Sequence, residues 1–246
     1  MKGGLNPPHS SALPLGKGVM SMAAIVTVGS SKGGSGKTTM SVLIAGELAN
    51  QGHKVLLVDT DIQKSSLKWY NRCIVNDAKP NGVDVIGAKN SLELSNIIEE
   101  NSDKDVIIVD TAGFASEIIF QLARVSDLFI LPCKISSLDA VEILDFVSSM
   151  RSESKSKGFD FPKYKVVLNE YDPIVKGAKS FENVHRLLTT GGVVVSDILL
   201  QKRERFKQVT EGMGSLYQIK TKDKATENAQ TNVHNLVYDL FNANEG

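Results

Sequence analysis

The chain has 246 residues, of which 41% are hydrophobic and 23% charged, and its 28 basic residues balance 28 acidic ones at a formal net charge of zero. This composition is typical of a folded α/β domain with an ample core. It argues against a protein that coats DNA through bulk charge, although it allows a local basic patch. Cys73 and Cys133 are too far apart in sequence for a disulfide framework or a zinc site, so a reducing cytosol is the expected compartment.

Residues 1–21 are rich in glycine, proline and serine and lack an apolar core long enough for a signal peptide. We interpret them as a disordered leader, a vector-derived segment or an upstream start, and we predict that residues 22–246 form a single domain. No apolar run in the sequence approaches 18 residues, so we expect no transmembrane helix.

Apolar runs rich in valine and isoleucine alternate with longer amphipathic stretches along the chain. The alternation predicts an α/β fold: a mostly parallel twisted sheet with helices on both faces and ligands at the carboxyl ends of its strands. The predicted strands are 23–29, 54–58, 83–87, 105–109, 127–131, 164–168 and 193–195. The predicted helices are 38–51, 64–76, 90–101, 115–123, 137–156, 176–189 and 226–243.

A glycine-rich loop, Ser31 to Thr39, lies between the first predicted strand and the first predicted helix. Such a loop places backbone N–H groups around phosphate oxygens, and its glycines let the backbone approach the anion without Cβ clashes. Lys37 is placed to reach the terminal phosphates, and the Thr38 hydroxyl is placed to ligate Mg²⁺. The alternative is a flexible Gly/Ser loop that carries a lysine, which leaves the spacing and the flanking elements unexplained.

Carboxylates follow two further predicted strands. Asp59 and Asp61 come after the second strand, where both side chains can point into one crevice. Asp110 ends an apolar strand, the Walker B form in which a carboxylate holds a Mg²⁺-bound water. The alternatives are solvated turn aspartates for the first pair and a helix cap for Asp110.

The motif K-G-G-x-G-K-[ST], which contains Lys32 and Lys37, resembles the deviant Walker A motif of the ParA/MinD family of ATPases. The V-D-x-D-x-Q that begins at Val58 and the D-T-A-G that begins at Asp110 extend this resemblance, which covers about residues 23–243. It implies a P-loop NTPase fold of the deviant Walker A type, closest to the short ParA-type partition ATPases. It also implies ATP hydrolysis with Mg²⁺, slow without a partner, and an ATP-dependent homodimer.

The resemblance gives each motif residue a role. Lys32 would reach the nucleotide of the other subunit, Asp61 would orient the attacking water, and Asn169 would contact the adenine; an ordinary turn residue is the alternative for Asn169. The expected catalytic residues are Lys32, Lys37 and Asp61. The expected metal-site residues, in part through water, are Thr38, Asp59 and Asp110. The expected nucleotide-binding residues are Lys32, Gly33, Gly34, Ser35, Gly36, Lys37, Thr38, Thr39 and Asn169.

Some positions depart from the family pattern. Ser31 stands where the general phosphate-loop motif has glycine, and Ile62 stands where the family often has proline. The D-T-A-G that begins at Asp110 replaces the D-x-P-P of many ParA proteins and is closer to the MinD form. Cys133 occupies a usually apolar position, where we expect a buried, unreactive thiol.

Four basic residues lie close together near the C-terminus: Lys202, Arg203, Arg205 and Lys207. Helical spacing would place them on adjacent faces, and the region resembles the C-terminal basic residues through which partition ATPases bind nonspecific DNA. No aromatic residues are interleaved for base reading, so binding would tolerate any sequence. The alternative is a solvated helix face.

These features predict an ATPase that dimerises on ATP, binds nonspecific DNA and positions or segregates a cargo such as a plasmid. A centromere-binding or adaptor protein would stimulate its hydrolysis. The expected location is cytoplasmic and nucleoid-associated in a prokaryote, with no membrane contact, because the amphipathic last helix has no Lys or Arg on its polar face. One alternative is an ATPase adaptor for a non-DNA cargo, such as conjugation or secretion machinery or a microcompartment. The other is a nucleotide-gated scaffold with negligible turnover.

Overall fold

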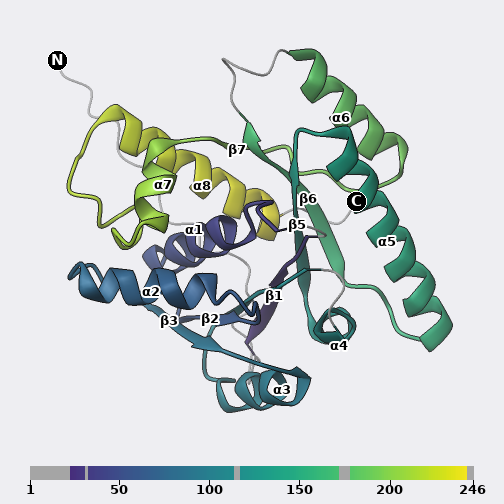
Figure 1. Ribbon diagram of the computed structural model, residues 1–246, viewed down its shortest axis with the longest axis horizontal. Helices are drawn as coiled ribbons and strands as arrows, with labels where there is room; N and C mark the ends of the chain where they lie inside the picture. The colour runs from purple at the N-terminus through teal and green to yellow at the C-terminus, as the bar shows by residue number, and fades with distance from the viewer. Residues whose placement is uncertain (1–22, 31–32, 114–116, 172–177, 243–246) are drawn as a thin grey trace.

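Seven parallel strands form one twisted sheet at the centre of the structure, a computed structural model that describes residues 23–30, 33–113, 117–171 and 178–242 (Figure 1). The strand order is β3-β2-β4-β1-β5-β6-β7, which confirms the predicted parallel sheet. The strands are β1 (Ala24–Val28), β2 (Val55–Asp59), β3 (Val83–Gly87), β4 (Val106–Asp110), β5 (Leu128–Lys134), β6 (Lys163–Tyr171) and β7 (Leu200–Gln201).

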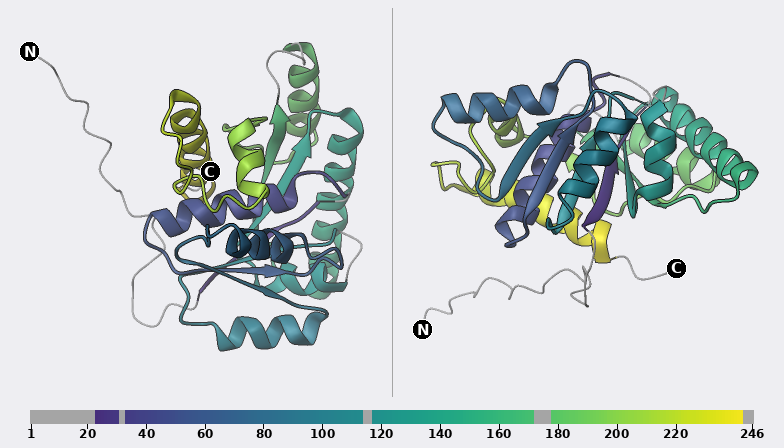
Figure 2. Two further views of the ribbon diagram at one scale, coloured as in Figure 1. Left: turned by 60° about the vertical axis from the view of Figure 1, so that its left-hand side comes forward. Right: turned by 90° about the horizontal axis from the view of Figure 1, so that it is seen from below.

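Helices cover both faces of this sheet (Figures 1 and 2). The apolar side chains of α1, α2, α7 and α8 pack on one face, and those of α3, α4, α5 and α6 pack on the other. Because both faces of the sheet are covered, β2 and β4 have apolar side chains on both faces and not only on every second residue. The helices are α1 (Lys37–Asn50), α2 (Ser65–Val75), α3 (Ser91–Glu100), α4 (Glu117–Val125), α5 (Ser137–Lys157), α6 (Ala178–Thr190), α7 (Glu204–Thr210) and α8 (Lys224–Asn242).

Two elements near the C-terminus differ from the predictions. The expected strand 193–195 makes a single bridge, Val195 to Val166, because the Ser196 hydroxyl accepts the backbone N–H of Ile198 at 3.1 Å and turns the chain. The edge strand is instead the two-residue β7. The short helix α7 lies outside the seven predicted helices.

The last helix packs on the domain, as its apolar spacing predicts. A buried carboxylate, Glu47 on α1, contacts the Tyr217 hydroxyl and lies 2.9 Å from His234 Nδ1 on α8. Burial is the main cause that raises the pKa of Tyr217 above its usual range. Polar contacts therefore join α8 to the helix that begins at the phosphate loop. The apolar residues of α8 buried in the core include Val233, Leu236, Val237 and Leu240.

Candidate functional site

The expected site residues meet at the carboxyl ends of three neighbouring strands. Asp59 ends β2, Asp110 ends β4, and the two pair directly in the parallel register. Val28 at the end of β1 lies opposite Asp110 on its other side, and the glycine-rich loop leaves the sheet from β1. The topology thus brings the loop and both carboxylates to one edge of the sheet, as parallel α/β sheets do with their ligand sites.

The glycine-rich loop leads directly into α1. Gly36 caps the helix with φ 95°, a backbone conformation that favours glycine. Lys37 is the first helical residue; its side chain is buried and donates from Nζ to Ser30 Oγ at 3.0 Å. Desolvation lowers the pKa of Lys37, while the charges of Asp110 and Asp61 oppose that shift. A buried ammonium at a helix N-terminus is well placed to bind a phosphate anion.

Asp110 has the features expected of a metal-site carboxylate. Its Oδ2 accepts hydrogen bonds from Thr38 Oγ1 at 2.7 Å and from Ser66 Oγ at 2.6 Å. Its Oδ1 is buried and has no hydrogen-bond partner among the described residues. Burial is the main cause that raises the pKa of this carboxyl to about 6. An orphaned oxygen beside a threonine hydroxyl fits a Mg²⁺ site, because that ion binds through one or two carboxylates and keeps several waters.

Both carboxylate oxygens of Asp59 accept hydrogen bonds from the backbone. Its Oδ1 accepts the N–H of Asp61 and its Oδ2 accepts the N–H of Leu67, both at 3.0 Å. Burial is the main cause that raises the pKa of Asp59, while these hydrogen bonds oppose the rise. Asp59 therefore shapes the turn into α2, and its contact with a metal shell stays a prediction.

Asp61 lies at the rim of the site. Its Oδ1 accepts the N–H of Gln63 at 2.8 Å, and the residue is half-buried. It lines a cavity of about 460 Å³ with Asp59, Lys64 and Lys89 among its other lining residues. The positioning of an attacking water by Asp61 stays a prediction.

Asn169 holds the phosphate loop in place. Its buried Nδ2 donates to the backbone oxygen of Ser35 at 2.9 Å, and its Oδ1 accepts the N–H of Glu170 at 2.8 Å. A Cβ added at Gly36 would lie 2.0 Å from Asn169 Nδ2, so the two residues leave no room for a larger one. Glu170 itself has φ 55° at an irregularity in β6. Asn169 thus braces the loop, and its contact with adenine stays a prediction.

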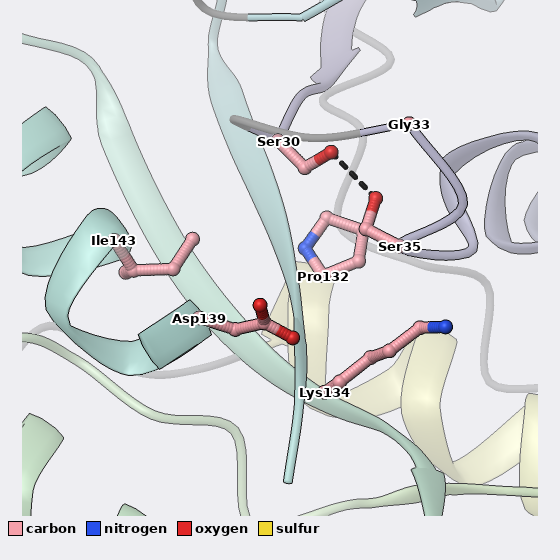
Figure 3. A pocket seen from close by; sticks show the side chains of 7 residues that line it. All are labelled: Ser30, Gly33, Ser35, Pro132, Lys134, Asp139 and Ile143. Carbon is pink, nitrogen blue, oxygen red and sulfur yellow. Dashed lines mark hydrogen bonds between the residues drawn. The ribbon is translucent and has the colours of Figure 1, made fainter. Parts of the chain in front are cut away.

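A cavity of about 200 Å³ lies beside the phosphate loop (Figure 3). Ser30 and Ser35, joined through their hydroxyls, line it from the loop side, and Asp139 and Ile143 line it from α5. Lys134, whose Nζ is 3.0 Å from Glu170 Oε2, lines the β5 side. The cavity therefore combines hydroxyls, a cation and a carboxylate next to the expected phosphate site.

The basic segment near the C-terminus differs from its predicted form. Lys202 and Arg203 precede α7 in non-helical backbone, so the helical spacing assumed for them is wrong. The guanidinium of Arg203 bonds Gln201 at 2.8 Å. The guanidinium of Arg205 bonds Gln208 at 2.9 Å and Asp223 at 2.6 Å, and its side chain is only 14% exposed. Lys202 and Lys207 alone of the four are well exposed.

Ser66 is a site residue that the sequence analysis did not assign. It lies on the buried face of α2 with Trp69 and Cys73, at spacings of three and seven residues. A hydroxyl inside an otherwise apolar helical stripe is the signal that singles it out. Ser31 and Lys32 lie outside the described residues, so the expected role of Lys32 across a dimer stays a prediction.

The described part of the chain contains no cluster of three or more His, Cys, Asp or Glu side chains able to hold a metal. Any Mg²⁺ would therefore need oxygens from water or phosphate in addition to the carboxylates described above. The thiol of Cys133 is buried, as expected, and the free thiol of Cys73 is buried as well. Within the described ranges, no helix combines the length and apolar character needed to cross a membrane.

Comparisons with known proteins agree with this architecture. The model of the CobQ/CobB/MinD/ParA nucleotide binding domain matches residues 26–216. Protein ParA of Rhizobium radiobacter is 26% identical over 210 residues, which cover 84% of this chain and 92% of that protein. The ATP complex of a single-residue variant of Cyanothece McdA superposes with a TM-score of 0.67 at 14% identity, covering 92% and 99% of the two chains. A chain of the MinC:MinD cell division protein complex of Aquifex aeolicus superposes with a TM-score of 0.65 at 18% identity, covering 87% and 95% of the two chains.

Proposed function

Since the chain belongs to the CobQ/CobB/MinD/ParA family of nucleotide-binding proteins and is an ATPase that uses ATP and Mg²⁺, we propose that it is a partition or positioning ATPase whose ATP-bound dimer binds DNA without sequence preference. A partner protein on the cargo stimulates hydrolysis and releases the dimer from DNA. The cargo in this proposal is a plasmid or another body that must be segregated.

The observation that carries the nucleotide-dependent part of the proposal is the state of Asp110. A fully buried carboxylate with one orphaned oxygen is costly unless a cation or donor uses it. Thr38 and Lys37 lie on the same loop-to-helix turn, where a triphosphate and its metal would bring the missing partners. This combination supports a site built for a metal-bound nucleotide.

The residues divide the hydrolysis of ATP among them. Lys37 binds the terminal phosphates. Thr38 and Asp110 would hold Mg²⁺, which would supply positive charge against the phosphate charge that develops. Asp61 orients a water whose oxygen attacks the γ-phosphorus while the bond to the β–γ bridging oxygen breaks. ADP leaves with that oxygen, and the water's protons pass to phosphate and solvent. Lys32 from the second copy adds the positive charge that two facing nucleotides require.

A DNA-free adaptor is the second candidate because of one observation. Arg203 and Arg205 direct their guanidinium groups to internal partners, which leaves Lys202 and Lys207 as the exposed cations of the predicted patch. Two exposed cations in a neutral chain give a weak DNA surface unless further basic residues join them.

Retention on random-sequence DNA tests the proposal directly. With ATP at low salt the protein should bind DNA, and with ADP or at high salt it should be released. Asp61→Ala should bind ATP, hydrolyse it slowly and stay on the DNA. If the wild type shows ATP turnover but no ATP-dependent retention at any salt concentration, the DNA-based function is wrong and the adaptor function is favoured.

A further inference from the structure

Helix α2 carries a continuous basic surface that the proposed function has not used. Lys64 caps the helix, and Lys68 and Arg72 follow at intervals of four residues, so the three side chains share one face. All three residues are exposed, and α2 contains no acidic residue between Ser65 and Val75. We refer to Lys64, Lys68 and Arg72 as the basic stripe.

The basic stripe runs toward α7. Arg72 Nη2 donates to the backbone oxygen of Thr210 at 2.8 Å, and Trp69 Nε1 donates to that of Val209 at 2.8 Å. Lys207 lies one turn before Thr210 and its side chain is 63% exposed, although Glu211 approaches it at 3.7 Å. These two hydrogen bonds join α2 to the end of α7, so Lys207 lies near the Arg72 end of the stripe. Because Arg72 already bonds α7, Lys64 and Lys68 are the cations of the stripe that would contact phosphate.

The first turn of α2 is bonded to Asp110 and Asp59, the two carboxylates at the strand ends. Ser66 Oγ donates to Asp110 Oδ2 at 2.6 Å, and the N–H of Leu67 donates to Asp59 Oδ2 at 3.0 Å. Any change in what Asp110 binds therefore acts on Ser66, which lies two residues from Lys64 and from Lys68. The position of the basic stripe is thus linked to the occupancy of the nucleotide site.

We propose that the basic stripe, with Lys207, is the surface on which DNA phosphates dock in the ATP-bound state. The inference rests on the proposed function and names the partner surface for it. Lysine ammonium groups bind phosphates as point charges, so the surface would fix the protein on DNA without reading bases. In a dimer the surface occurs twice, which multiplies the effect of each phosphate contact.

The test uses the full chain and fluorescent random-sequence duplex DNA with ATP, across a salt series. The double variant Lys64→Asn/Lys68→Gln removes two charges; asparagine is chosen because Lys64 has φ 51°. Its affinity should fall by roughly tenfold at low salt, and the slope of log affinity against log salt should fall by about two per chain. The matched control Lys155→Gln/Lys179→Gln makes the same charge change on α5 and α6, at exposed positions on the opposite face. The control should stay within about twofold of the wild type.

The outcomes separate this inference from the proposed function. If the stripe variant folds, binds ATP and keeps wild-type DNA affinity and salt slope, the stripe is wrong while the DNA-based function stands. If the control loses as much affinity as the stripe variant, bulk charge explains the loss and the stripe is also wrong. If the wild type itself is not retained on DNA with ATP, the proposed DNA-based function is wrong, and the inference about the stripe that rests on it is wrong as well. If the stripe variant loses binding to anionic phospholipid vesicles and DNA binding is unchanged, the surface serves a membrane instead.

Discussion

The phosphate-loop region and the α7 region were both predicted from short runs of sequence, and they differ in how the side chains are held. In the first, Lys37 bonds Ser30 and Thr38 bonds Asp110, so each of these side chains is held by a neighbour within the site. In the second, basic residues that are adjacent in sequence point to separate internal partners, as Arg203 and Arg205 do. The phosphate-loop motif implies a backbone geometry, so it predicts where its side chains lie. A run of basic residues implies no geometry, so it does not predict which of them are exposed.

Loss of Lys37 should have the largest effect on the first region. Lys37→Ala removes the buried ammonium that faces Asp110, and we expect ATP affinity to weaken by at least about 100-fold, consistent with the loss of charge-assisted hydrogen bonds. Titration calorimetry with a nonhydrolysable analogue measures this. Lys54→Ala, an exposed lysine next to the start of β2, should bind as the wild type does. Wild-type affinity in Lys37→Ala would contradict the assignment of the loop.

The brace between Asn169 and Gly36 predicts the next largest effect. Gly36→Ala puts a methyl group into the Asn169 amide, so we expect a loss of about 1–3 kcal/mol in stability and roughly tenfold in ATP affinity. Gly52→Ala is a matched control, because its φ of 93° is similar but no atom lies within 4 Å of the added Cβ. Adding Asn169→Ala to Gly36→Ala should recover part of the excess cost, as chemical denaturation of the double-mutant cycle would show. If Gly36→Ala and Gly52→Ala lost the same stability, the contact with Asn169 would not constrain Gly36.

Acidification should weaken metal-dependent binding moderately. The pKa of Asp110 is raised from 3.8 to about 6, so in the nucleotide-free protein its carboxyl stabilises the fold while protonated, and this contribution is lost as pH rises through about 6. Mg²⁺ needs the ionised form, so Mg²⁺-dependent nucleotide affinity should be about fourfold weaker at pH 5.5 than the plateau above pH 7. Asp110→Asn should bind more weakly and lose this pH dependence, which isothermal titration at each pH can measure. An unchanged pH profile in that variant would assign the titration to another group.

The smallest effects are expected in the α7 region, where they should distinguish the internally bonded Arg205 from the exposed Lys207. Arg205→Gln should lower the midpoint of thermal unfolding by a few degrees and leave DNA affinity nearly unchanged, because its guanidinium is bonded internally. Lys207→Gln should do the reverse, with DNA affinity reduced roughly threefold and the salt slope by about one. Differential scanning fluorimetry and DNA titration check the pair. A DNA defect in Arg205→Gln at full stability would restore the predicted patch.

The strand–helix alternation and the motif spacing were sufficient to predict the parallel sheet, the phosphate loop and the carboxylates at its edge. The rest depended on contacts between distant segments. Asn169 reaches Ser35 only because β6 and β1 flank β5 in the sheet, an order that spacing does not give. The helix α7 was missed because its buried stripe is only Phe206 and Val209, too short for a clear period.

The contact of Glu47 with α8 bears on how deletion experiments should be interpreted. A chain shortened before His234 would take one polar partner from the buried Glu47 carboxylate, which lies on the helix whose first residue is Lys37. If such a truncated protein failed to bind nucleotide, the cause would be a destabilised fold. The result would not show that the removed segment has a function of its own. Fluorescent fusions joined after Asn242 avoid this fault and are the safer route to following the protein in cells.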